Sequence, residues 1–230
     1  MTKKKEAGTI ELLSEPLTDI DTIKPAVTAL EQRQLIARQL NIVSGQITWQ
    51  TAPTEQTLRY NGQQLIIVYG PIWQLLIIGA GQISRYLSEF ALALNYQVTI
   101  CDPRQEYAAT WQTEGTRLDN RMPDDAVKAL IQDKRSAVVA LTHDPKLDDM
   151  ALLEALNLQA FYIGALGSKS NNEKRRKRLT DLGISEKALA RLHAPIGLPI
   201  GSRTPPEIAI AILAEMTAVR NKTPIWSPKL

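Results

Sequence analysis

The chain has 230 residues, of which 44% are hydrophobic and 22% charged; this balance is ordinary for a globular protein and excludes a wholly disordered one. Aromatic residues make up only 5%, and 27 basic against 24 acidic residues leave a formal charge of +3, so neither a base-stacking platform nor a nucleic-acid partner is indicated. One cysteine, Cys101, excludes an internal disulfide and a multi-cysteine zinc or iron–sulfur site.

Residues 1–71 predict a small N-terminal α+β region. Prolines and scattered charges before residue 26 are typical of a loosely ordered arm, and apolar spacing predicts a helix over 26–40. Asn61-Gly62 marks a tight hairpin turn between the last two of three short strands. The strands comprise residues 47–50, 58–60 and 64–70. Because so small a region buries little by itself, we expect it to need a partner surface, and a homodimer would provide one.

Residues 72–230 alternate between strand and helix signals and predict a Rossmann-like domain. Residues 74–79 are mostly apolar and end in glycine, as in a strand buried on both faces. Since such alternation requires crossover connections, the fold class is α/β, a parallel sheet flanked by helices. Further strands are expected at 97–102, 136–142 and 159–163, and helices at 82–95, 123–133, 148–157, 168–182, 185–191 and from 204 onward.

The apolar runs are too short for a bilayer, which takes roughly 20 residues to cross. Residues 75–78 form one of the longest. The basic start leads into Gly8, Glu11 and Ser14 rather than into an apolar core, so no signal peptide is indicated. The expected location is the cytoplasm, with no membrane partner.

The first glycine motif, Gly79-Ala80-Gly81, lies between the first strand of the domain and its helix. Gly79 permits a tight turn, and Gly81 lets the backbone approach a pyrophosphate at the positive end of the helix. Ser84 takes the place of the usual third glycine, and Asp102 ends the next strand, where a carboxylate can accept hydrogen bonds from ribose hydroxyls. The pattern favours a Rossmann-type crevice; the alternative is a packing turn with Asp102 merely solvated.

A second glycine loop, residues 164–168, again joins a strand to a helix. Gly164 and Gly167 would expose backbone amides beside the helix N-terminus, and Ser168 can cap it. Loops that follow parallel strands open on the same edge of the sheet, so this loop and the first could line one crevice. An ordinary capped helix start is the alternative.

The third segment, residues 193–207, is rigid and irregular because it contains two prolines and two glycines, Gly197 among them, before the last helix. Thr204 and Glu207 predict a capping box at the start of that helix. Arg203 adds a cation beside a positive helix end, which favours binding of a phosphate or other oxyanion. The alternative is an ion pair between Arg203 and a nearby carboxylate.

The fourth group, His143 and Asp144, directly follows the third strand of the domain. Polar groups at the carboxyl end of a strand lie where α/β enzymes place their working residues. One histidine beside an aspartate is not a metal-ligand spacing, and a structural His143 bonded to a loop carbonyl is an equal alternative.

Two further features favour structural interpretations. The basic run 174–178 wraps more than one helical turn, which favours a solvated face over an acidic partner or phosphate. Cys101 lies in a predicted buried strand and is expected to be an inert core thiol.

Taken together, the segments LLIIGAG, VTICDPR, VVALTHDPKLD, YIGALGSK and HAPIGLPIGSRTPPEIAIAILAE, in unbroken order across residues 72–220, closely resemble the C-terminal Rossmann domain of the XdhC/CoxI family of xanthine dehydrogenase accessory proteins. The resemblance implies a chaperone that binds molybdenum cofactor, supports its sulfuration and delivers it to an apo molybdoenzyme of the xanthine dehydrogenase type. A sulfur donor is a further implied partner.

The resemblance departs at the N-terminus, where family members carry a glycine-rich segment with a cysteine; this chain has no cysteine before Cys101. We therefore assign no sulfur ligand, no metal ligand and no catalytic residue. The expected cofactor-binding residues are Gly79, Gly81, Ser84, Asp102, His143, Asp144, Gly164, Gly167, Ser168, Gly197 and Arg203.

Two other functions are open at this point. An NAD(P)-dependent oxidoreductase would explain Gly79–Ser84 and Asp102 but would leave residues 193–207 without a role. A ligand-free scaffold that docks onto a molybdoenzyme or sulfur donor is the other. The cofactor-carrier interpretation requires the three turns to meet at one edge of the sheet.

Overall fold

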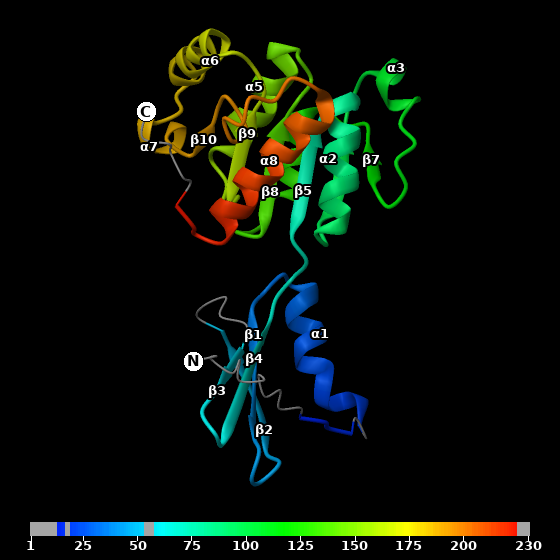
Figure 1. Ribbon diagram of the computed structural model, residues 1–230, viewed down its shortest axis with the longest axis vertical. Coiled ribbons are helices and arrows are strands. Elements are labelled where there is room, and N and C mark those ends of the chain that lie inside the picture. Colours follow the sequence, from blue (N-terminus) through cyan, green and yellow to red (C-terminus); the bar gives the residue numbers. More distant parts are fainter. Residues whose placement is uncertain (1–12, 17–18, 53–57, 225–230) are drawn as a thin grey trace, which may run out of the picture. The chain divides into compact units, whose positions relative to one another are not determined.

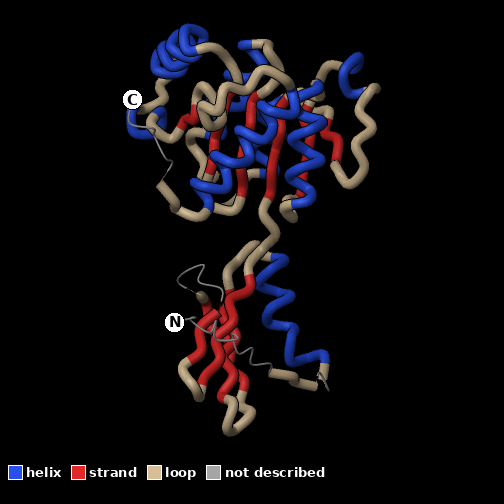
Figure 2. The backbone as a smooth tube through the Cα atoms, in the orientation of Figure 1, coloured by secondary structure: helices blue, strands red, loops and turns tan. Residues whose placement is uncertain are grey.

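The structure, a computed structural model, describes residues 13–16, 19–52 and 58–224. The chain divides into two compact units, Met1–Gly70 and Pro71–Leu230, one residue away from the expected boundary. Each unit is described by itself below (Figures 1 and 2).

The first unit contains an antiparallel sheet with strand order β2-β1-β4-β3. Asn61 stabilises the predicted hairpin turn, because its Oδ1 accepts hydrogen bonds from the amides of Gln63 and Gln64. Trp49 packs at 5.9 Å from Tyr69 and donates its indole N–H to the carbonyl of Thr22. The elements are η1 (Ile20–Ile23), α1 (Lys24–Glu31), β1 (Ile36–Asn41), β2 (Ile47–Thr51), β3 (Leu58–Tyr60) and β4 (Gln64–Tyr69).

The predicted helix over 26–40 is wrong in its second half. The helix α1 ends at Glu31, and Arg33 follows in the left-handed region with φ of 54°. Residues Ile36–Asn41 form β1, which pairs with β2 on one side and β4 on the other. A central strand gains ladder hydrogen bonds along both edges, and this pairing overrides the local helical spacing.

The second unit is built on a six-stranded sheet with the order β10-β9-β8-β5-β6-β7, and every pairing in it is parallel. From β5 the chain builds outward to β6 and β7, then returns to the other side of β5 for β8, β9 and β10. The strand order therefore reverses between β5 and β8, where open α/β sheets form their crevice. The strands are β5 (Gln74–Ile78), β6 (Gln97–Cys101), β7 (Arg117–Asp119), β8 (Ser136–Ala140), β9 (Tyr162–Ala165) and β10 (Leu192–His193).

Helices cover both faces of this sheet (Figure 1). Alternate residues of β5 point to opposite faces: Leu75 and Ile77 pack with α2 and α8, while Leu76 and Ile78 pack with α4 and α5. The Rossmann-like α/β prediction is confirmed. The helices are α2 (Gln82–Ala93), α3 (Gln105–Ala108), α4 (Pro123–Leu130), α5 (Pro145–Ala155), α6 (Lys169–Asp181), α7 (Glu186–Leu189) and α8 (Pro205–Arg220).

The observed bounds of some strands and helices differ from the predicted bounds by a few residues. The strand expected at 159–163 is β9, Tyr162–Ala165, and the helix expected from 148 begins at Pro145. Among the described residues, none of the helices has both the length and the apolar character needed to span a membrane.

Candidate functional site

A cleft of about 340 Å³ opens at the crevice between β5 and β8. We name it the α2 cleft, because the N-terminal turn of α2 forms one wall. It brings together the first glycine turn, His143 and the start of α8, which come from widely separated parts of the chain. Its lining residues are Gly79, Gly81, Gln82, Ile83, Ser84, Arg104, Tyr107, Leu141, Thr142, His143 and Pro205.

The two glycines of the first turn differ in what they allow. Gly79 has φ of 106°, and a Cβ there would lie 3.0 Å from the backbone N and Cα of Thr142, so only glycine fits without a shift. Gly81 is the N-cap residue of α2, and a Cβ on it would meet nothing within 4 Å. Gly79 therefore shapes the turn, whereas Gly81 leaves the helix end open to the cleft.

Ser84 contributes to packing. Its side chain is fully buried and its hydroxyl donates a hydrogen bond to the carbonyl of Gly79. This bond fastens the first turn of α2 to the glycine turn. Ser84 nevertheless lines the α2 cleft, and its contact with a ligand stays a prediction.

Asp102 is fully buried, and its carboxylate is occupied by the protein itself. The amide of Ala80 donates to Oδ2 at 2.8 Å, and Arg104 donates from its amide, Nε and Nη2. A carboxylate has about four acceptor positions, and these hydrogen bonds occupy them. Burial tends to raise the pKa of Asp102, but the hydrogen bonds outweigh it and lower the pKa. The Asp102 carboxylate is thus used within the folded chain, and its contact with ribose hydroxyls stays a prediction.

Arg104, the partner of Asp102 in this ion pair, lines the α2 cleft. Its guanidinium carbon lies 4.0 Å from the centroid of the Tyr107 ring, in cation–π geometry. Arg104 is therefore held on two sides, by Asp102 and by Tyr107. The spacing of an aspartate followed two residues later by an arginine was visible in the sequence and is the signal that could have revealed the pair.

His143 is exposed and has φ of 61°, a left-handed conformation that few residues other than glycine adopt. Within residues 13–16, 19–52 and 58–224, its ring makes no hydrogen bond. A hydrogen bond from the His143 ring to a loop carbonyl, the alternative raised from the sequence, is thus not observed within these residues. Asp144 caps α5, because its Oδ1 accepts from the amide of Lys146 at 2.9 Å.

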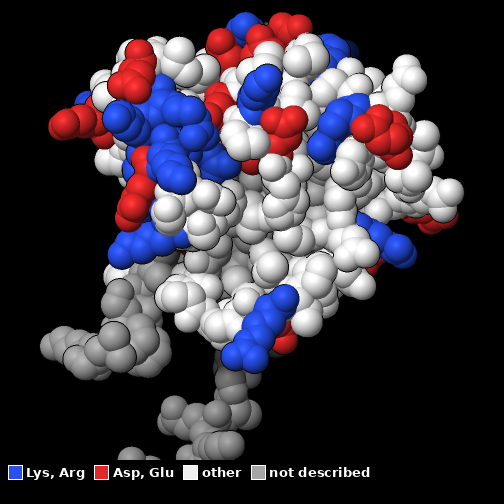
Figure 3. All heavy atoms as spheres, turned by 90° about the horizontal axis from the view of Figure 1, so that it is seen from above, with Lys and Arg blue, Asp and Glu red and all other residues white. Residues whose placement is uncertain are grey.

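A second cleft of about 260 Å³ shares His143 with the first. We name it the α6 cleft, because four of its residues come from α6. Figure 3 shows Lys and Arg side chains gathered at this end of the unit, on the side where Figure 1 places α6. Its lining residues are His143, Pro145, Asp148, Leu166, Gly167, Asn171, Lys174, Arg175 and Arg178.

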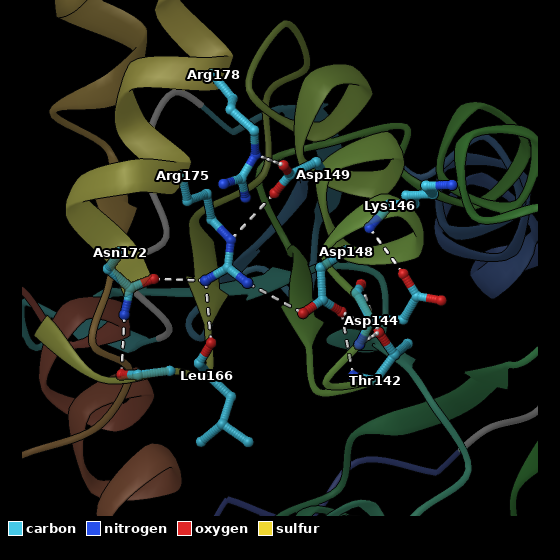
Figure 4. A network of polar contacts seen from close by, with 10 residues as sticks. Thr142, Asp144, Lys146, Asp148, Asp149, Leu166, Asn172, Arg175 and Arg178 are labelled. Carbon is cyan, nitrogen blue, oxygen red and sulfur yellow. Dashed lines mark hydrogen bonds and ion pairs between the residues drawn. The ribbon is translucent and has the colours of Figure 1, made fainter. Parts of the chain in front are cut away.

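Arg175 lines the α6 cleft and is only 5% exposed, which makes it the buried floor of the cleft. Figure 4 shows the polar contacts that hold it. It donates to Asp148 at 3.1 Å, to Asp149 at 3.2 Å and to the carbonyl of Leu166 at 3.0 Å. It also donates to the side-chain oxygen of Asn172. The expectation of a solvated basic run is wrong for this residue, because the two carboxylates of α5 bury it.

The partners of Arg175 are themselves held. Asp148 accepts from the amide and hydroxyl of Thr142 at 3.1 and 2.7 Å, and Arg178 donates to Asp149 at 2.6 Å. Burial of Asp148 raises its pKa, although the Thr142 bonds and the charge of Arg175 act in the opposite direction. The network joins the end of β8 to α5 and α6.

The two glycines of the second glycine loop differ in their surroundings. A Cβ on Gly164 would clash with the Ile196 side chain and lie 2.8 Å from Tyr162, so the lack of a side chain permits close packing here; its contact with a ligand stays a prediction. Gly167 lines the α6 cleft. Ser168 caps α6 as predicted, because its hydroxyl accepts from the amide of Asn171 at 3.2 Å.

The third segment supplies its own anion. The capping box is confirmed, and Glu207 Oε2 accepts from the amides of Arg203 and Thr204 at 2.7 and 2.9 Å. Hydrogen bonds from these two amides lower the pKa of Glu207. These two amides are therefore bonded within the chain, and the oxyanion contact of Arg203 stays a prediction. Arg203 does not line the α2 or α6 cleft, and no ion pair of its side chain occurs among the described residues.

Gly197 belongs to a polar cluster that the sequence analysis missed. Its amide donates to Glu215 at 2.8 Å, and Glu215 also bonds the Tyr162 hydroxyl and His193 Nδ1. The rings of Tyr162 and His193 stack at 4.5 Å. The Gly197 amide thus fixes the loop to α8, and the ligand contact of Gly197 stays a prediction.

Cys101 is buried as predicted. Desolvation, with the charges of Asp119 and Asp102, raises the pKa of its thiol to about 12. In the described part of the chain, no group of three or more His, Cys, Asp or Glu residues could hold a metal ion.

A larger hollow of about 620 Å³ lies beside the α2 cleft, sharing Gly81 and Gln82 with it. Its walls are the outer side of α2 and residues 110–114, and the ion pair between Arg85 and Glu89 lies in it. Apart from Gly81, no expected site residue lines it.

The sequence-predicted residues therefore meet only in part. The turns after β5, β8 and β9 contribute Gly79, Gly81, His143 and Gly167 to two adjoining clefts. The segment before α8 contributes Pro205 alone.

Comparison with known proteins gives consistent matches. The model of the XdhC Rossmann domain family matches residues 75–216. The uncharacterised protein YqeB of Escherichia coli is 32% identical over 161 residues, 69% of this chain and 29% of that protein. The molybdenum cofactor insertion chaperone PaoD of E. coli is 24% identical over 213 residues, 93% of this chain and 60% of PaoD.

A solved structure described as a xanthine dehydrogenase from Bacillus halodurans has a TM-score of 0.68 at 20% identity, with 93% of this chain and 69% of that chain covered. At this identity the likeness concerns the fold. The chain spans less than two thirds of the length of both E. coli relatives.

Proposed function

This chain belongs to the XdhC Rossmann domain family, and from that premise we propose that it binds molybdenum cofactor and supports maturation of a molybdoenzyme of the xanthine dehydrogenase type. The name of PaoD, a molybdenum cofactor insertion chaperone, supports an accessory role. The observation that carries the proposal is the pair of clefts that share His143 at the crevice of the sheet.

The α2 cleft suits a flat, partly polar ring. Ile83, Leu141 and Tyr107 provide apolar and aromatic surface, and Gly81 leaves the first-turn amides of α2 approachable. A pterin has a flat heterocycle with donors and acceptors on its edge, which such a mixed lining matches. His143, with no internal hydrogen bond among the described residues, supplies a further donor or acceptor.

A carrier must also release its cargo. Cys101 is buried with a pKa of about 12, so its thiol is poorly suited to bind molybdenum through sulfur. Hydrogen bonds and helix dipoles then hold the cofactor, and such contacts are readily exchanged for those of the client enzyme. We propose the cytoplasm as the location, an apo molybdoenzyme and a sulfur donor as partners, and a homodimer as the assembly.

The alternative of an NAD(P)-dependent oxidoreductase is less well supported. In dinucleotide-binding Rossmann domains, the carboxylate at the end of the second strand accepts from ribose. Here the Asp102 carboxylate is filled by Ala80 and Arg104. A ligand-free docking scaffold would leave the clefts without a role.

The proposal is tested by titrating purified protein with molybdenum cofactor released from a molybdoenzyme, in parallel with NADH and NADPH. We expect stoichiometric binding of the pterin and none of the nicotinamides. Gly81→Ala should fold normally and bind the pterin about tenfold more weakly, because Gly81 lines the cleft and the added methyl group would occupy space that no protein atom fills within 4 Å. Lys177→Ala, on the exposed side of α6, is the control and should bind as the wild type does.

Failure of the wild-type protein to bind the pterin would contradict the proposal. Nicotinamide binding with hydride transfer would support the oxidoreductase alternative, and capture of a molybdoenzyme without any bound ligand would support the scaffold.

A further inference from the structure

The two adjoining clefts differ in charge. In the α2 cleft the lining cation is Arg104, and Asp102 neutralises it with two side-chain hydrogen bonds at 2.8 and 2.9 Å. The pKa of Arg104 is raised, first by its hydrogen bonds to Asp102 and further by the nearby charges of Asp102 and Asp144. The positive charge of Arg104 is therefore already neutralised by carboxylates, so the α2 cleft offers little attraction to a phosphate.

The α6 cleft carries excess positive charge. Its cations are Lys174, Arg175 and Arg178, whereas the carboxylates paired with them are Asp148 and Asp149. In the part of the chain that the structure describes, Lys174 makes no ion pair. One lysine charge at the cleft is thus left uncompensated, in a hollow where an anion would be partly desolvated.

The donors of this cleft are arranged at two depths. Arg175, buried at the floor, is held by four different partners and cannot swing away. Arg178 uses Nε for Asp149, and its Nη groups make no hydrogen bond to any other residue that the structure describes. Its side chain is 43% exposed. Lys174 and Asn171 lie on the same helix face, one turn before Arg178 and Arg175, and also line the hollow.

We propose that the α6 cleft is a phosphoryl-binding subsite, with Lys174 and Arg178 as its ligand-contacting cations and Arg175 as the fixed floor. The inference rests on the proposed function for its ligand, the pterin cofactor, whose phosphoryl end would lie in the α6 cleft and whose ring would lie in the α2 cleft. His143, which lines both clefts, stands between the two ends. This placement differs from the usual Rossmann arrangement, in which the first helix of the domain holds the phosphate.

The observations favour a small oxyanion over an acidic protein surface. The hollow is concave, has a volume of about 260 Å³, and has a buried charged floor, whereas a docking face for a protein is broad and flat. Charge-assisted hydrogen bonds from guanidinium and ammonium groups to phosphate are the strongest contacts that this lining can make.

The test uses the full chain and two probes. Inorganic pyrophosphate, titrated by calorimetry, examines the subsite without any pterin, and molybdenum cofactor examines the whole ligand. Lys174→Ala should weaken pyrophosphate binding about tenfold, the effect of losing one charge-assisted hydrogen bond. Lys177→Ala removes the same charge from the same helix but from a residue that does not line the cleft, and it should change binding by less than about twofold.

A second variant tests the role of His143, which lines both clefts. His143→Asn removes the imidazole, and asparagine tolerates the left-handed backbone at this position. It should weaken pterin binding and leave pyrophosphate binding within about twofold of the wild type, because the phosphoryl contacts come from α6.

The outcomes separate the subsite from the function. If the wild-type chain binds the pterin, and Lys174→Ala binds both probes as well as Lys177→Ala does, the subsite is overturned and the proposed function stands. If the chain binds pyrophosphate with the expected loss in Lys174→Ala but does not bind the pterin, the subsite stands and the proposed function fails. If an acidic peptide binds the cleft and pyrophosphate does not displace it, the phosphoryl assignment is overturned.

Discussion

The buried guanidinium of Arg175 makes a quantitative prediction about the stability of the Rossmann unit. Replacement by methionine keeps an unbranched side chain of similar length but removes the charge and all the donors. Asp148, at 1% exposure, then keeps its bonds to Thr142 and loses its only bonded cation among the described residues. The carbonyl of Leu166 loses the Arg175 donor as well.

The magnitude follows from these losses. Removing one partner of a buried ion pair costs about 3–5 kcal/mol, because the remaining charge stays buried without compensation. Asp149 moderates the cost, since Arg178 still donates to it. We therefore expect Arg175→Met to lower the free energy of unfolding by about 3–4 kcal/mol near pH 8.

The effect should depend on pH. The pKa of Asp148 is already raised above its usual 3.8 by burial, and loss of the Arg175 charge raises it further. A carboxyl with a raised pKa in the folded state binds its proton more tightly when folded, so its stabilising contribution is complete below 3.8 and is lost as the pH rises through the folded-state pKa. The cost of Arg175→Met should thus be smaller near pH 5 than near pH 8.

The assay is calorimetric unfolding of the full chain, with hydrogen exchange of β8 used to assign the transition of the Rossmann unit. Adding Asp148→Asn to Arg175→Met should restore about 1–3 kcal/mol, because the amide oxygen still accepts from Thr142 and no charge is left buried. Lys177→Ala should stay within about 0.5 kcal/mol of wild type. A cost that does not change with pH, or a double variant no more stable than Arg175→Met, would show that Arg175 does not neutralise a buried Asp148 charge.

Three further predictions concern the first turn, the thiol and the last helix. Gly79→Ala should lower the free energy of unfolding by about 2–4 kcal/mol, because of the Thr142 backbone contact and the positive φ, whereas Gly81→Ala should cost less than about 1 kcal/mol; equal losses in chemical denaturation would contradict this. Cys101 should resist iodoacetamide at pH 8 in the folded protein and react after unfolding, as checked by mass spectrometry. Because the pKa of Glu207 is lowered, wild-type stability should fall as the pH drops below about 4.5, and Glu207→Gln should lack that part of the decline in thermal melts across the same pH range.

The sheet and the first glycine turn were predictable because their signals are local. Apolar runs such as 74–79 and the spacing Gly79-Ala80-Gly81 each specify one backbone shape. The same locality misled the prediction over 26–40, where pairing of β1 along both edges decided the structure.

The charged interior was not predictable in this way. Arg175 lies in a run of five basic residues, and nothing within that run distinguishes the buried residue from the exposed lysines and half-buried arginines beside it. Its partners Asp148 and Asp149 are supplied by another helix, 27 and 26 residues earlier in the chain. Asp102 directly follows β6, as predicted, but its hydrogen bonds to Arg104, two residues later, were not predicted.

The hydrogen bond from Ala80 to Asp102 has a consequence for how quickly the α2 cleft can be filled. An amide of the glycine turn is anchored to the neighbouring strand in the folded chain, and Ser84 anchors the carbonyl side of the same turn. The loop is therefore immobilised when the domain folds, and an arriving molecule loses no conformational entropy by ordering it. The rate at which a ligand binds the α2 cleft is therefore set by diffusional encounter and by correct orientation, because the turn does not have to rearrange first.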